Sequence, residues 1–240
     1  NDDKYNDDED SWYYADGSGN LYAGEFKTIK GKKYAFRDDG RMIDGLKFIK
    51  EEGNGLDVIA DDDATYNFDN EDDFDENSLA LEALGYKCYY FGNGDDGAMK
   101  TGKQNVTIDG DSFSFKFKTG SNLKGAGING FDDDKLYTAG KQIKADKDDK
   151  YKVYKVTTKA DSNYCKVEDM TVSEFLKVQD GIDKVEKSYS STKEETTWKI
   201  TYTDYATDAP EVVKFYLLNT SGTVVKSKSG AKDADDYKFY

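Results

Sequence analysis

The stretch Ile29–Gly45 reads IKGKKYAFRDDGRMIDG, and both of its halves recur elsewhere in the 240-residue chain. Tyr34 and Phe36 are two residues apart, which places both rings on one face of an extended strand. The turn residues Asp38-Asp39-Gly40 follow, and an Asp-Gly pair readily supplies the positive φ of a tight turn. Met42 then returns to the same face, so the stretch predicts a β-hairpin that ends at a second glycine.

The second half of this stretch is one copy of the spacing G-x-φ-x-x-G, in which φ is an apolar residue. The copies run over Gly19–Gly24, Gly40–Gly45 and Gly97–Gly102, with a weaker copy at Gly222–Ser227 and a looser one at Asp134–Ala139. The first half, Ile29–Phe36, matches Ile108–Phe115 position for position in its pattern. The first period is 45 − 24 = 21 residues, which suits one hairpin and a connector.

Repetition at this short period determines the expected fold class. An isolated hairpin is marginal in water, whereas stacked hairpins cover one another's aromatic faces, so the array is stable only as an array. The chain has 22 glycines and one proline, which is typical of many tight turns between short strands. We therefore predict a mostly-β chain, a β-hairpin solenoid of imperfect repeats of about 20 residues with minor helical insertions.

Changes in composition along the chain predict three regions. These are an acidic linker at 1–10, hairpin repeats over 11–149 with an insertion at about 46–84, and an elaborated C-terminal repeat region over 150–240 with a helix near 172–187. The insertion contains acidic clusters and an apolar run that predicts a short helix ending at Gly85. Thr171 and Glu174 have the spacing of a capping box, which indicates the C-terminal helix. Alternatively, 150–240 is an independent α+β domain with its own partner.

The charge balance limits the chemistry open to the chain. It has 34 Lys and Arg against 49 Asp and Glu, a net charge of −15, and its only arginines are Arg37 and Arg41. An acidic chain with so few arginines binds phosphate groups poorly, which disfavours nucleic acid and anionic membranes as partners. The lack of any histidine removes Ser-His and Cys-His nucleophile pairs and histidine metal sites. We expect a protein that is not an enzyme, with no cofactor and no metal site.

Membrane insertion and a disulfide framework are also not expected. No apolar run approaches the ~20 residues that span a bilayer. Cys88 and Cys165 are far apart and form no C-x-x-C motif. We expect two unpaired, buried thiols, and a single long-range disulfide between them is the alternative.

The stretches Ser11–Gly24 and Ile29–Gly45 each carry aromatic residues before a glycine motif. They resemble the cell-wall-binding repeats of Gram-positive surface proteins, which are the repeats of choline-binding and glucan-binding proteins. The likeness is good over 11–49 and 86–116 and fair over 212–240, which is under half of the chain. It implies a β-hairpin solenoid that is secreted and held at the cell surface, without catalytic activity. In the family, choline or sugar rings sit in aromatic cages between successive hairpins.

The resemblance also implies which residues bind a ligand. Six aromatic residues match the first strand of the repeat and are the predicted ligand-binding residues: Trp12, Tyr14, Tyr34, Phe36, Tyr89 and Phe91. The implied partner is a cell-wall polymer, a glycan or a choline-like group, with other surface proteins as further partners. The protein is then secreted or at the cell surface, associated with the cell wall, and binds by stacking its rings on sugar faces.

The same residues allow a purely structural interpretation. Aromatic side chains on strand faces usually belong to the core, so these rings can simply pack hairpin on hairpin. Choline-binding repeats carry Gly-Trp after the glycine motif, whereas here Gly24 is followed by Glu25-Phe26 and Gly102 by Lys103-Gln104. This difference favours an alternative function, a structural spacer or protein-interaction module of a surface protein with no small-molecule ligand.

Acidic residues allow two further interpretations. Asp16–Glu25 has a glycine, an apolar residue and a glutamate at EF-hand offsets, but Tyr14 occupies the first ligand position, and the segment equally predicts a hairpin turn. The clusters at 61–63 and 69–76 could hold Ca²⁺, although a solvated insertion is the simpler interpretation. A glycosidase needs two carboxylates across a pocket, but in so acidic a chain some pair always exists.

Overall fold

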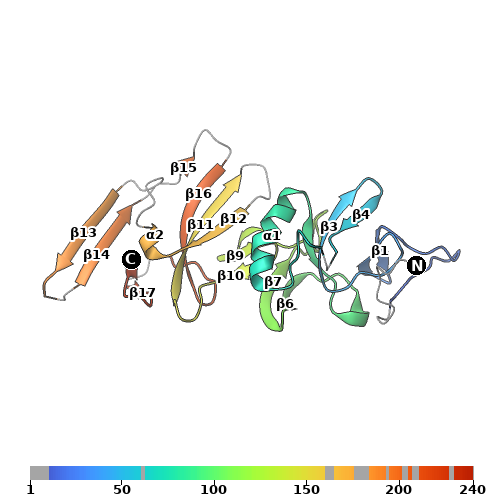
Figure 1. The fold of residues 1–240 in the computed structure, drawn as a ribbon, viewed down its shortest axis with the longest axis horizontal. Coiled ribbons are helices and arrows are strands. Elements are labelled where there is room, and N and C mark those ends of the chain that lie inside the picture. The colour runs from blue at the N-terminus through green and yellow to red at the C-terminus, as the bar shows by residue number, and fades with distance from the viewer. Residues whose placement is uncertain are drawn as a thin grey trace. The chain divides into compact units, whose positions relative to one another are not determined.

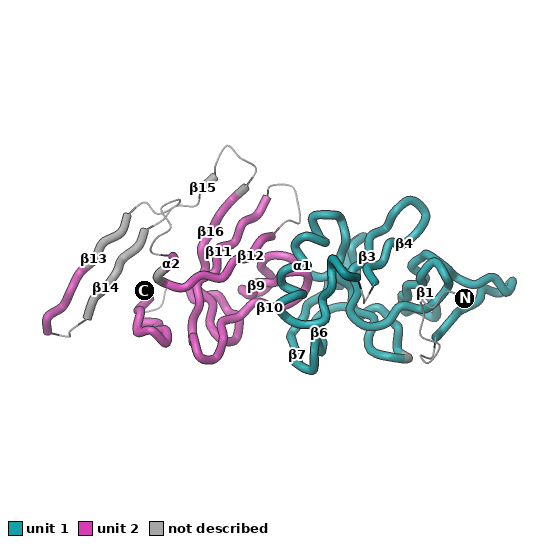
Figure 2. The backbone as a smooth tube through the Cα atoms, in the orientation of Figure 1, with its two compact units in different colours: residues 1–127 teal, residues 128–240 magenta. Residues whose placement is uncertain are grey.

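The computed structural model describes residues 11–60, 63–159, 165–175, 184–192, 195–201, 205–206, 211–226 and 230–239. The chain divides into two compact units, unit 1 (residues 1–127) and unit 2 (residues 128–240), which are teal and magenta in Figure 2. Within the described residues, the regular secondary structure of both units is mostly short antiparallel strands, and no sheet closes on itself. The predicted mostly-β fold class is therefore confirmed, while the predicted linker at 1–10 lies outside the described residues.

Unit 1 combines hairpins with a small sheet and a helix (Figure 1). Its elements are β1 (Phe26–Ile29), β2 (Lys32–Ala35), β3 (Leu46–Glu52), β4 (Gly55–Val58), α1 (Glu71–Ala83), β5 (Lys87–Tyr90), the 3-10 helix η1 (Gly94–Asp96), β6 (Gly102–Ile108) and β7 (Asp111–Phe117). Strands β1 and β2 form one antiparallel hairpin and β6 and β7 form another, while β3 lies between β4 and β5. The segment 46–84, which the sequence marks as an insertion, contains β3, β4 and α1.

The β1–β2 and β6–β7 hairpins have their turns inside the two matched segments, Ile29–Phe36 and Ile108–Phe115, where the sequence pattern predicted no turn. The β1–β2 hairpin turns at Lys30-Gly31 and the β6–β7 hairpin at Asp109-Gly110. In both turns the two central residues have positive φ, +49° and +82° in the first and +48° and +81° in the second. This is the type I′ geometry, which fits the twist of paired strands. The match between Ile29–Phe36 and Ile108–Phe115 therefore corresponds to two hairpins of the same kind.

A second kind of turn, five residues long, occurs at 16–20, 37–41, 219–223 and 233–237. In each, the N–H of the first residue donates to the carbonyl of the fifth over 2.8 to 3.2 Å. The fourth residue is Gly19, Gly40 or Gly222 in three of these turns, with φ of +86°, +86° and +71°. In the last turn Asp236 takes that position at φ +68°. In three copies of the G-x-φ-x-x-G spacing, the first glycine thus gives the five-residue turn its left-handed step, whereas Gly97 of a further copy follows a 3-10 helix.

Backbone hydrogen bonds connect turn segments that are distant in the sequence. The Met42 N–H donates to the Trp12 carbonyl (2.8 Å), and the Met99 N–H donates to the Lys33 carbonyl (2.7 Å). The Gly127 N–H likewise donates to the Cys88 carbonyl (2.8 Å). Within unit 1, the residue two positions after a glycine of positive φ (Gly40, Gly97 or Gly125) therefore recurs as a donor to an earlier segment of the chain.

Turn glycines in unit 1 lie against side chains from these earlier segments. The Tyr13 ring covers Gly40, and a Cβ there would lie 3.4 Å from it. The Met42 side chain covers Gly97 in the same way, and the Met99 side chain covers Gly125. Gly19 differs, because nothing lies within 4 Å of the position that its Cβ would take.

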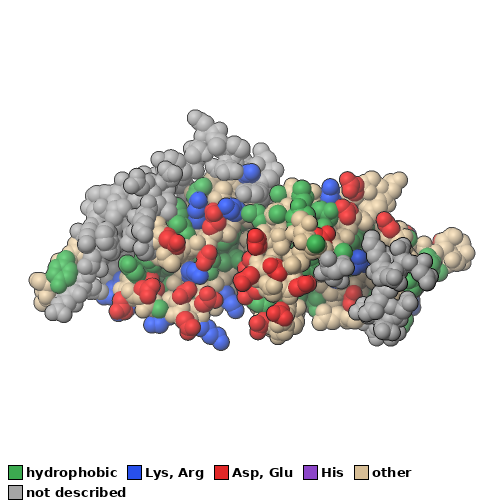
Figure 3. All heavy atoms as spheres, in the orientation of Figure 1, with side chains coloured by type: hydrophobic (Ala, Val, Ile, Leu, Met, Phe, Trp, Pro, Cys, Tyr) green, Lys and Arg blue, Asp and Glu red, His purple; other side chains and the backbone are tan. Residues whose placement is uncertain are grey.

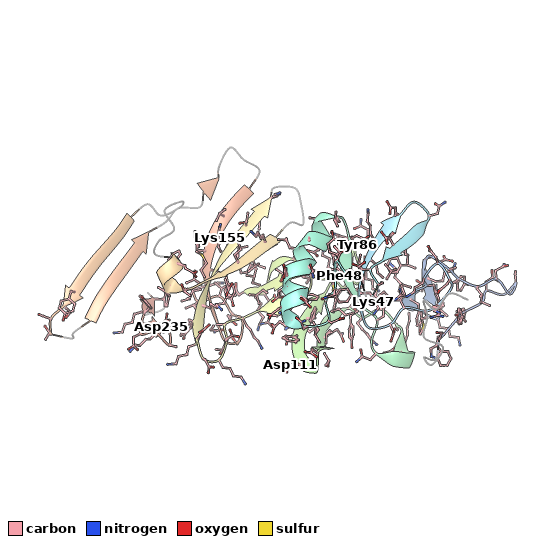
Figure 4. The ribbon with its side chains drawn as sticks, in the orientation of Figure 1. Lys47, Phe48, Tyr86, Asp111, Lys155 and Asp235 are labelled. Carbon is pink, nitrogen blue, oxygen red and sulfur yellow. The ribbon has the colours of Figure 1, made fainter. Side chains whose placement is uncertain are left out.

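The core of unit 1 is largely aromatic. Phe74 of α1 lies against Phe48 of β3, with 5.8 Å between ring centroids, and against Phe115 of β7 at 5.5 Å. Phe115 in turn stacks on Phe117, and all four rings are buried. Figure 4 labels Phe48 beside α1. Large rings supply the buried area that a chain with few aliphatic residues would otherwise lack.

Unit 2 is built around two antiparallel sheets and two further hairpins. Its elements are β8 (Gly130–Asp132), β9 (Lys135–Thr138), β10 (Lys141–Ile143), β11 (Tyr151–Lys159), β12 (Cys165–Met170), α2 (Val172–Phe175), β13 (Lys184–Ser190), β14 (Glu195–Thr201), β15 (Tyr205–Ala206), β16 (Glu211–Asn219), β17 (Ala231–Lys232) and β18 (Lys238–Phe239). Strand β9 lies between β8 and β10, and β11 lies between β12 and β16. Strands β13 and β14 pair with each other, as do β17 and β18. Val156, Leu136 and Leu218 belong to one core cluster of this unit, and Phe175 and Phe215 belong to another.

The helix expected near 172–187 is shorter in the structure. It begins with the predicted capping box, because the Glu174 N–H donates to the Thr171 hydroxyl (3.1 Å) and the Thr171 N–H donates to the Glu174 carboxylate (2.8 Å). Residues 176–183 lie outside the described residues, and from Lys184 the chain forms strand β13. There Val185 pairs with Ile200 of β14, so the C-terminal end of the predicted helix is a strand of a β-hairpin instead.

Cys88 and Cys165 are both buried and are not joined in a disulfide, as predicted. Burial raises the pKa of the Cys88 thiol well above its usual value, with a smaller contribution from Glu82. In the part of the chain that the structure describes, no helix has the length and apolar character needed to cross a bilayer.

Candidate functional site

The structure separates the six predicted ligand-binding residues by their exposure. Two are exposed, one is half-buried and three are buried: Trp12 (52% exposed) and Tyr14 (41%), then Tyr34, then Phe36 (1%), Tyr89 (5%) and Phe91 (0%). The exposed pair lies in the first turn segment of the described chain. The candidate site therefore lies around Trp12 and Tyr14, with Tyr34 at partial exposure.

The three buried rings are packed into unit 1. Tyr89 lies 5.4 Å from the ring of Phe26 and 6.3 Å from the ring of Phe91, between centroids. Burial raises the pKa of Tyr89 to about 12, with a smaller contribution from Glu51. Phe36 contacts Tyr22 at 5.9 Å. A ligand would reach these rings only if the core opened, so in this structure they support the fold.

Tyr14 is held in place by a ring that the sequence pattern did not single out. Tyr22 stacks on Tyr14 with 5.9 Å between centroids and 8° between ring planes, and it also contacts the ring of the buried Phe36. The Tyr22 N–H donates to the Tyr14 carbonyl (3.0 Å), which pairs the two residues across the five-residue turn. We call Trp12, Tyr14 and Tyr22 the aromatic platform.

The sequence contains an indication that Tyr22 belongs to the site. The G-x-φ-x-x-G spacing identified Leu21 as the residue that returns to the aromatic face, yet Leu21 is 56% exposed in the structure. Tyr22, one position later, makes the ring contact. Neighbouring residues of an extended strand point to opposite faces. An aromatic residue next to the φ position, here Tyr22, is therefore a second candidate for the aromatic face.

The turn that joins Tyr14 to Tyr22 is shaped by Asp16. Its carboxylate accepts hydrogen bonds from the backbone N–H groups of Ser18 (2.8 Å) and Asn20 (2.9 Å) and from the Asn20 side chain (3.2 Å). These bonds lower the pKa of Asp16, and the backbone of Asn20 has the largest effect. The segment therefore forms the hairpin turn that the sequence allowed as the simpler interpretation of Asp16–Glu25.

A lysine lies over the inner ring of the platform. The Lys27 Nζ is 4.4 Å from the centroid of Tyr22 and 3.6 Å from the Glu25 carboxylate. Lys27 is also the cross-strand partner of Tyr34 in the β1–β2 hairpin. A similar contact occurs on the same hairpin, where the Lys33 Nζ lies 4.3 Å above the ring of Phe26. Aromatic faces of unit 1 are thus covered in part by the chain's own ammonium groups.

The acidic side chains are distributed over the surface. On the face shown in Figure 3, Asp and Glu gather over the part of unit 1 that holds α1, whose first turn carries Glu71, Asp72 and Asp73. Among the described residues, no three or more Asp, Glu or Cys side chains converge as the ligands of a metal ion would. Residues 61 and 62 of the first acidic cluster lie outside the described residues.

Comparisons with known proteins give remote structural likenesses. No protein-family model matches the chain, and no curated protein matches it. Among solved structures it is similar to choline binding protein F from Streptococcus pneumoniae in crystal form II, with 17% identity and a TM-score of 0.34, over 90% of this chain and 44% of that chain. The likeness to CbpF in complex with ipratropium has the same identity and TM-score, over 90% and 42%. CbpJ from Streptococcus pneumoniae TIGR4 gives 12% identity and a TM-score of 0.19, over 95% and 96%. The chain thus spans less than half the length of choline binding protein F.

Proposed function

We propose that this chain is a non-catalytic module of a cell-surface protein that binds a cell-wall polymer or glycan through the aromatic platform. The platform stands on the outside of unit 1, and its rings offer flat apolar faces of the kind that pack against the face of a sugar ring. The sequence resemblance to cell-wall-binding repeats supports the same partner class and the location at the cell wall. The lack of histidine supports a role in binding rather than catalysis.

The main support for the proposal is that the exposed ring of Tyr14 stacks on the ring of Tyr22, which itself packs against the core. Tyr14 is 41% exposed, yet it lies parallel to Tyr22, which itself packs on the buried Phe36. A ring that is already held in place loses little conformational entropy when a ligand stacks on it. Four of the seven large hydrophobic side chains that are exposed among the described residues lie in this segment, namely Trp12, Tyr13, Tyr14 and Leu21. Concentrated apolar exposure of this kind is typical of interaction sites.

The proposal includes a solenoid-like stacking of turn segments within unit 1. Its support is the recurrent donor position, in which Met42 and Met99 each bond to a carbonyl of an earlier segment. The glycines covered by Tyr13, Met42 and Met99 add side-chain packing to the same series. Stacked units would present successive aromatic segments along one array, as repeat architectures do.

One observation favours the alternative function of a structural spacer or protein-interaction module. Three of the six predicted ligand-binding residues, Phe36, Tyr89 and Phe91, are buried and serve the core. If the remaining platform is also only packing surface, the chain would connect or display other parts of a surface protein without binding a small ligand.

Sedimentation with purified Gram-positive cell walls tests the proposal. We expect the native chain to sediment with walls and the double variant Trp12→Ala/Tyr14→Ala to remain in the supernatant. The variant Tyr189→Ala is the matched control, because Tyr189 of β13 is 64% exposed and lies in unit 2. Failure of the native chain to bind walls or soluble wall glycans would instead favour the spacer.

A further inference from the structure

The ring of Tyr22 contacts three side chains of unit 1. Tyr14 stacks on it, Phe36 packs on it at 47°, and the Lys27 ammonium lies 4.4 Å from its centroid. The third contact places a positive charge where the ring quadrupole is most attractive to cations. An aromatic cage for a quaternary ammonium group needs that position, so here the chain's own side chain already fills it.

The β1–β2 hairpin fixes the position of this ammonium group. Lys27 is paired across the strands with Tyr34, and side chains of cross-strand partners lie on the same face of a hairpin. Lys27 therefore lies on the same face of the hairpin as the half-buried Tyr34, and its Nζ lies over Tyr22, the inner ring of the platform. The Glu25 carboxylate, 3.6 Å from the Lys27 Nζ, is a further contact that holds the ammonium group in this region.

The positive charge of Lys27 disfavours a cationic ligand at Tyr22 but does not disfavour an uncharged one. A quaternary ammonium group that approached Tyr22 would meet a like charge and would have to displace Lys27 from the ring. An uncharged sugar needs only an apolar face and hydrogen-bond partners, and the outer ring of Tyr14 remains 41% exposed. A second lysine on the same hairpin, Lys33 over Phe26, shows that the arrangement is not restricted to one ring.

We propose that Lys27 is a specificity-determining residue of the aromatic platform, which keeps quaternary ammonium groups off Tyr22 and leaves the platform to uncharged sugar rings. The inference rests on the proposed function, because it names which ligand class that platform accepts. Lys27 acts by occupying the cation position over the ring, so removal of its charge, with its apolar stem retained, opens that position.

The test is a titration of the full chain with tetramethylammonium chloride at constant ionic strength, followed through the NMR signals of the platform rings. We expect Lys27→Met to bind tetramethylammonium about two- to five-fold more tightly than the native chain, the size of one exposed cation–π contact. Lys27→Arg keeps a cation over the ring and should behave as the native chain does. Lys103→Met is the matched control, because it removes the same charge from an exposed position on β6.

Equal affinity of the native chain and Lys27→Met for tetramethylammonium would overturn the inference, and so would no binding to either. An equal gain in Lys103→Met would overturn it too, since the effect would then follow net charge alone. Thermal melts of all variants check that the fold is retained. A parallel titration with soluble wall glycan separates the two proposals. If the glycan fails to bind while the tetramethylammonium series follows the expectation, the proposed function falls, and of the inference only the exclusion of quaternary ammonium groups by Lys27 stands.

Discussion

Glycines in unit 1 are required for two different reasons, a left-handed backbone conformation and close packing against a side chain. Gly19 and Gly125 have nearly the same backbone conformation, with φ of +86° and +90°. Gly125 lies under the Met99 side chain, whereas Gly19 has no neighbour within 4 Å of its would-be Cβ. The first residue is needed for the left-handed step alone, and the second is needed for that step and for close packing.

Alanine substitution at these two glycines should therefore have unequal costs. We expect Gly19→Ala to lower the free energy of unfolding by about 1 kcal/mol, the cost of a left-handed non-glycine residue. Gly125→Ala should cost roughly 1–3 kcal/mol more, because the added methyl group overpacks against Met99. Urea denaturation of both variants measures the difference, and equal costs would contradict the packing role of Gly125.

Tyr86 and Tyr89 make the fold sensitive to alkaline pH. A hydrogen bond from the Tyr86 hydroxyl to Asp57, together with burial, raises the pKa of Tyr86 to about 12, and burial raises the pKa of Tyr89 to about 12. Both values lie above the unfolded value of 10.0. Their contribution to stability is therefore fully present below pH 10 and is lost as the pH rises toward 12.

An alkaline titration followed by phenolate absorbance and circular dichroism checks this expectation. We predict a late group of tyrosines that ionises together with unfolding, and one fewer late tyrosine in Tyr86→Phe. Tyr86→Phe also leaves Asp57 without this donor and should cost about 1 kcal/mol at neutral pH. If all tyrosines ionised near their usual pKa with the fold intact, the assignment would be wrong.

Helix α1 owes its position to a cap and to one ring. The Asn70 side chain accepts a hydrogen bond from the Asp73 N–H (3.0 Å), and acidic residues fill the first turn, where the helix dipole favours them. Phe74 then anchors the helix between Phe48 and Phe115. The sequence predicted only the apolar end of this helix, because its first turns look like a solvated acidic cluster until Phe74 has partners.

We expect Asn70→Ala to lower the free energy of unfolding by about 1 kcal/mol, since it leaves the Asp73 N–H without its cap. Asn70→Ser should restore most of the loss, because serine is also a good N-cap residue. Thermal or urea melts of the two variants give the answer. A serine variant as unstable as the alanine variant would show that Asn70 stabilises the unit by some other contact.

Local turn chemistry was predictable from the sequence, and ring exposure was not. The turn predicted at Asp38-Asp39-Gly40 lies in the five-residue turn 37–41, where Gly40 has a φ of +86° that glycine adopts without strain. Tyr13 and Phe91 each lie six residues before the first glycine of a repeat copy, Gly19 and Gly97, yet one is 45% exposed and the other 0%. Their difference arises from segments far away in the sequence, which a pattern of nearby residues does not contain. The end of the helix predicted near 172–187 lies in β13 instead, whose partner β14 follows it in the next hairpin strand, outside the segment that carried the helical pattern.

For the molecule as a whole, the net charge of −15 determines how the binding of a wall polymer should depend on salt. Many exposed carboxylates repel an anionic polymer, so binding by ring stacking would not depend on charge attraction. We expect wall binding to be unchanged or strengthened as salt is added, because salt screens the repulsion. Sedimentation with walls over a salt series measures this, and a steep loss of binding with salt would point to lysine contacts instead of rings.

The most direct test of the aromatic platform uses Trp12 as its own reporter. The chain has two tryptophans, so Trp198→Phe leaves Trp12 as the only one. Titration of this variant with soluble wall glycan should give a saturable change in Trp12 emission. The change should be lost when Tyr14→Ala is added and kept when Tyr189→Ala is added. No change in emission, or equal binding with and without the Tyr14 ring, would contradict the account.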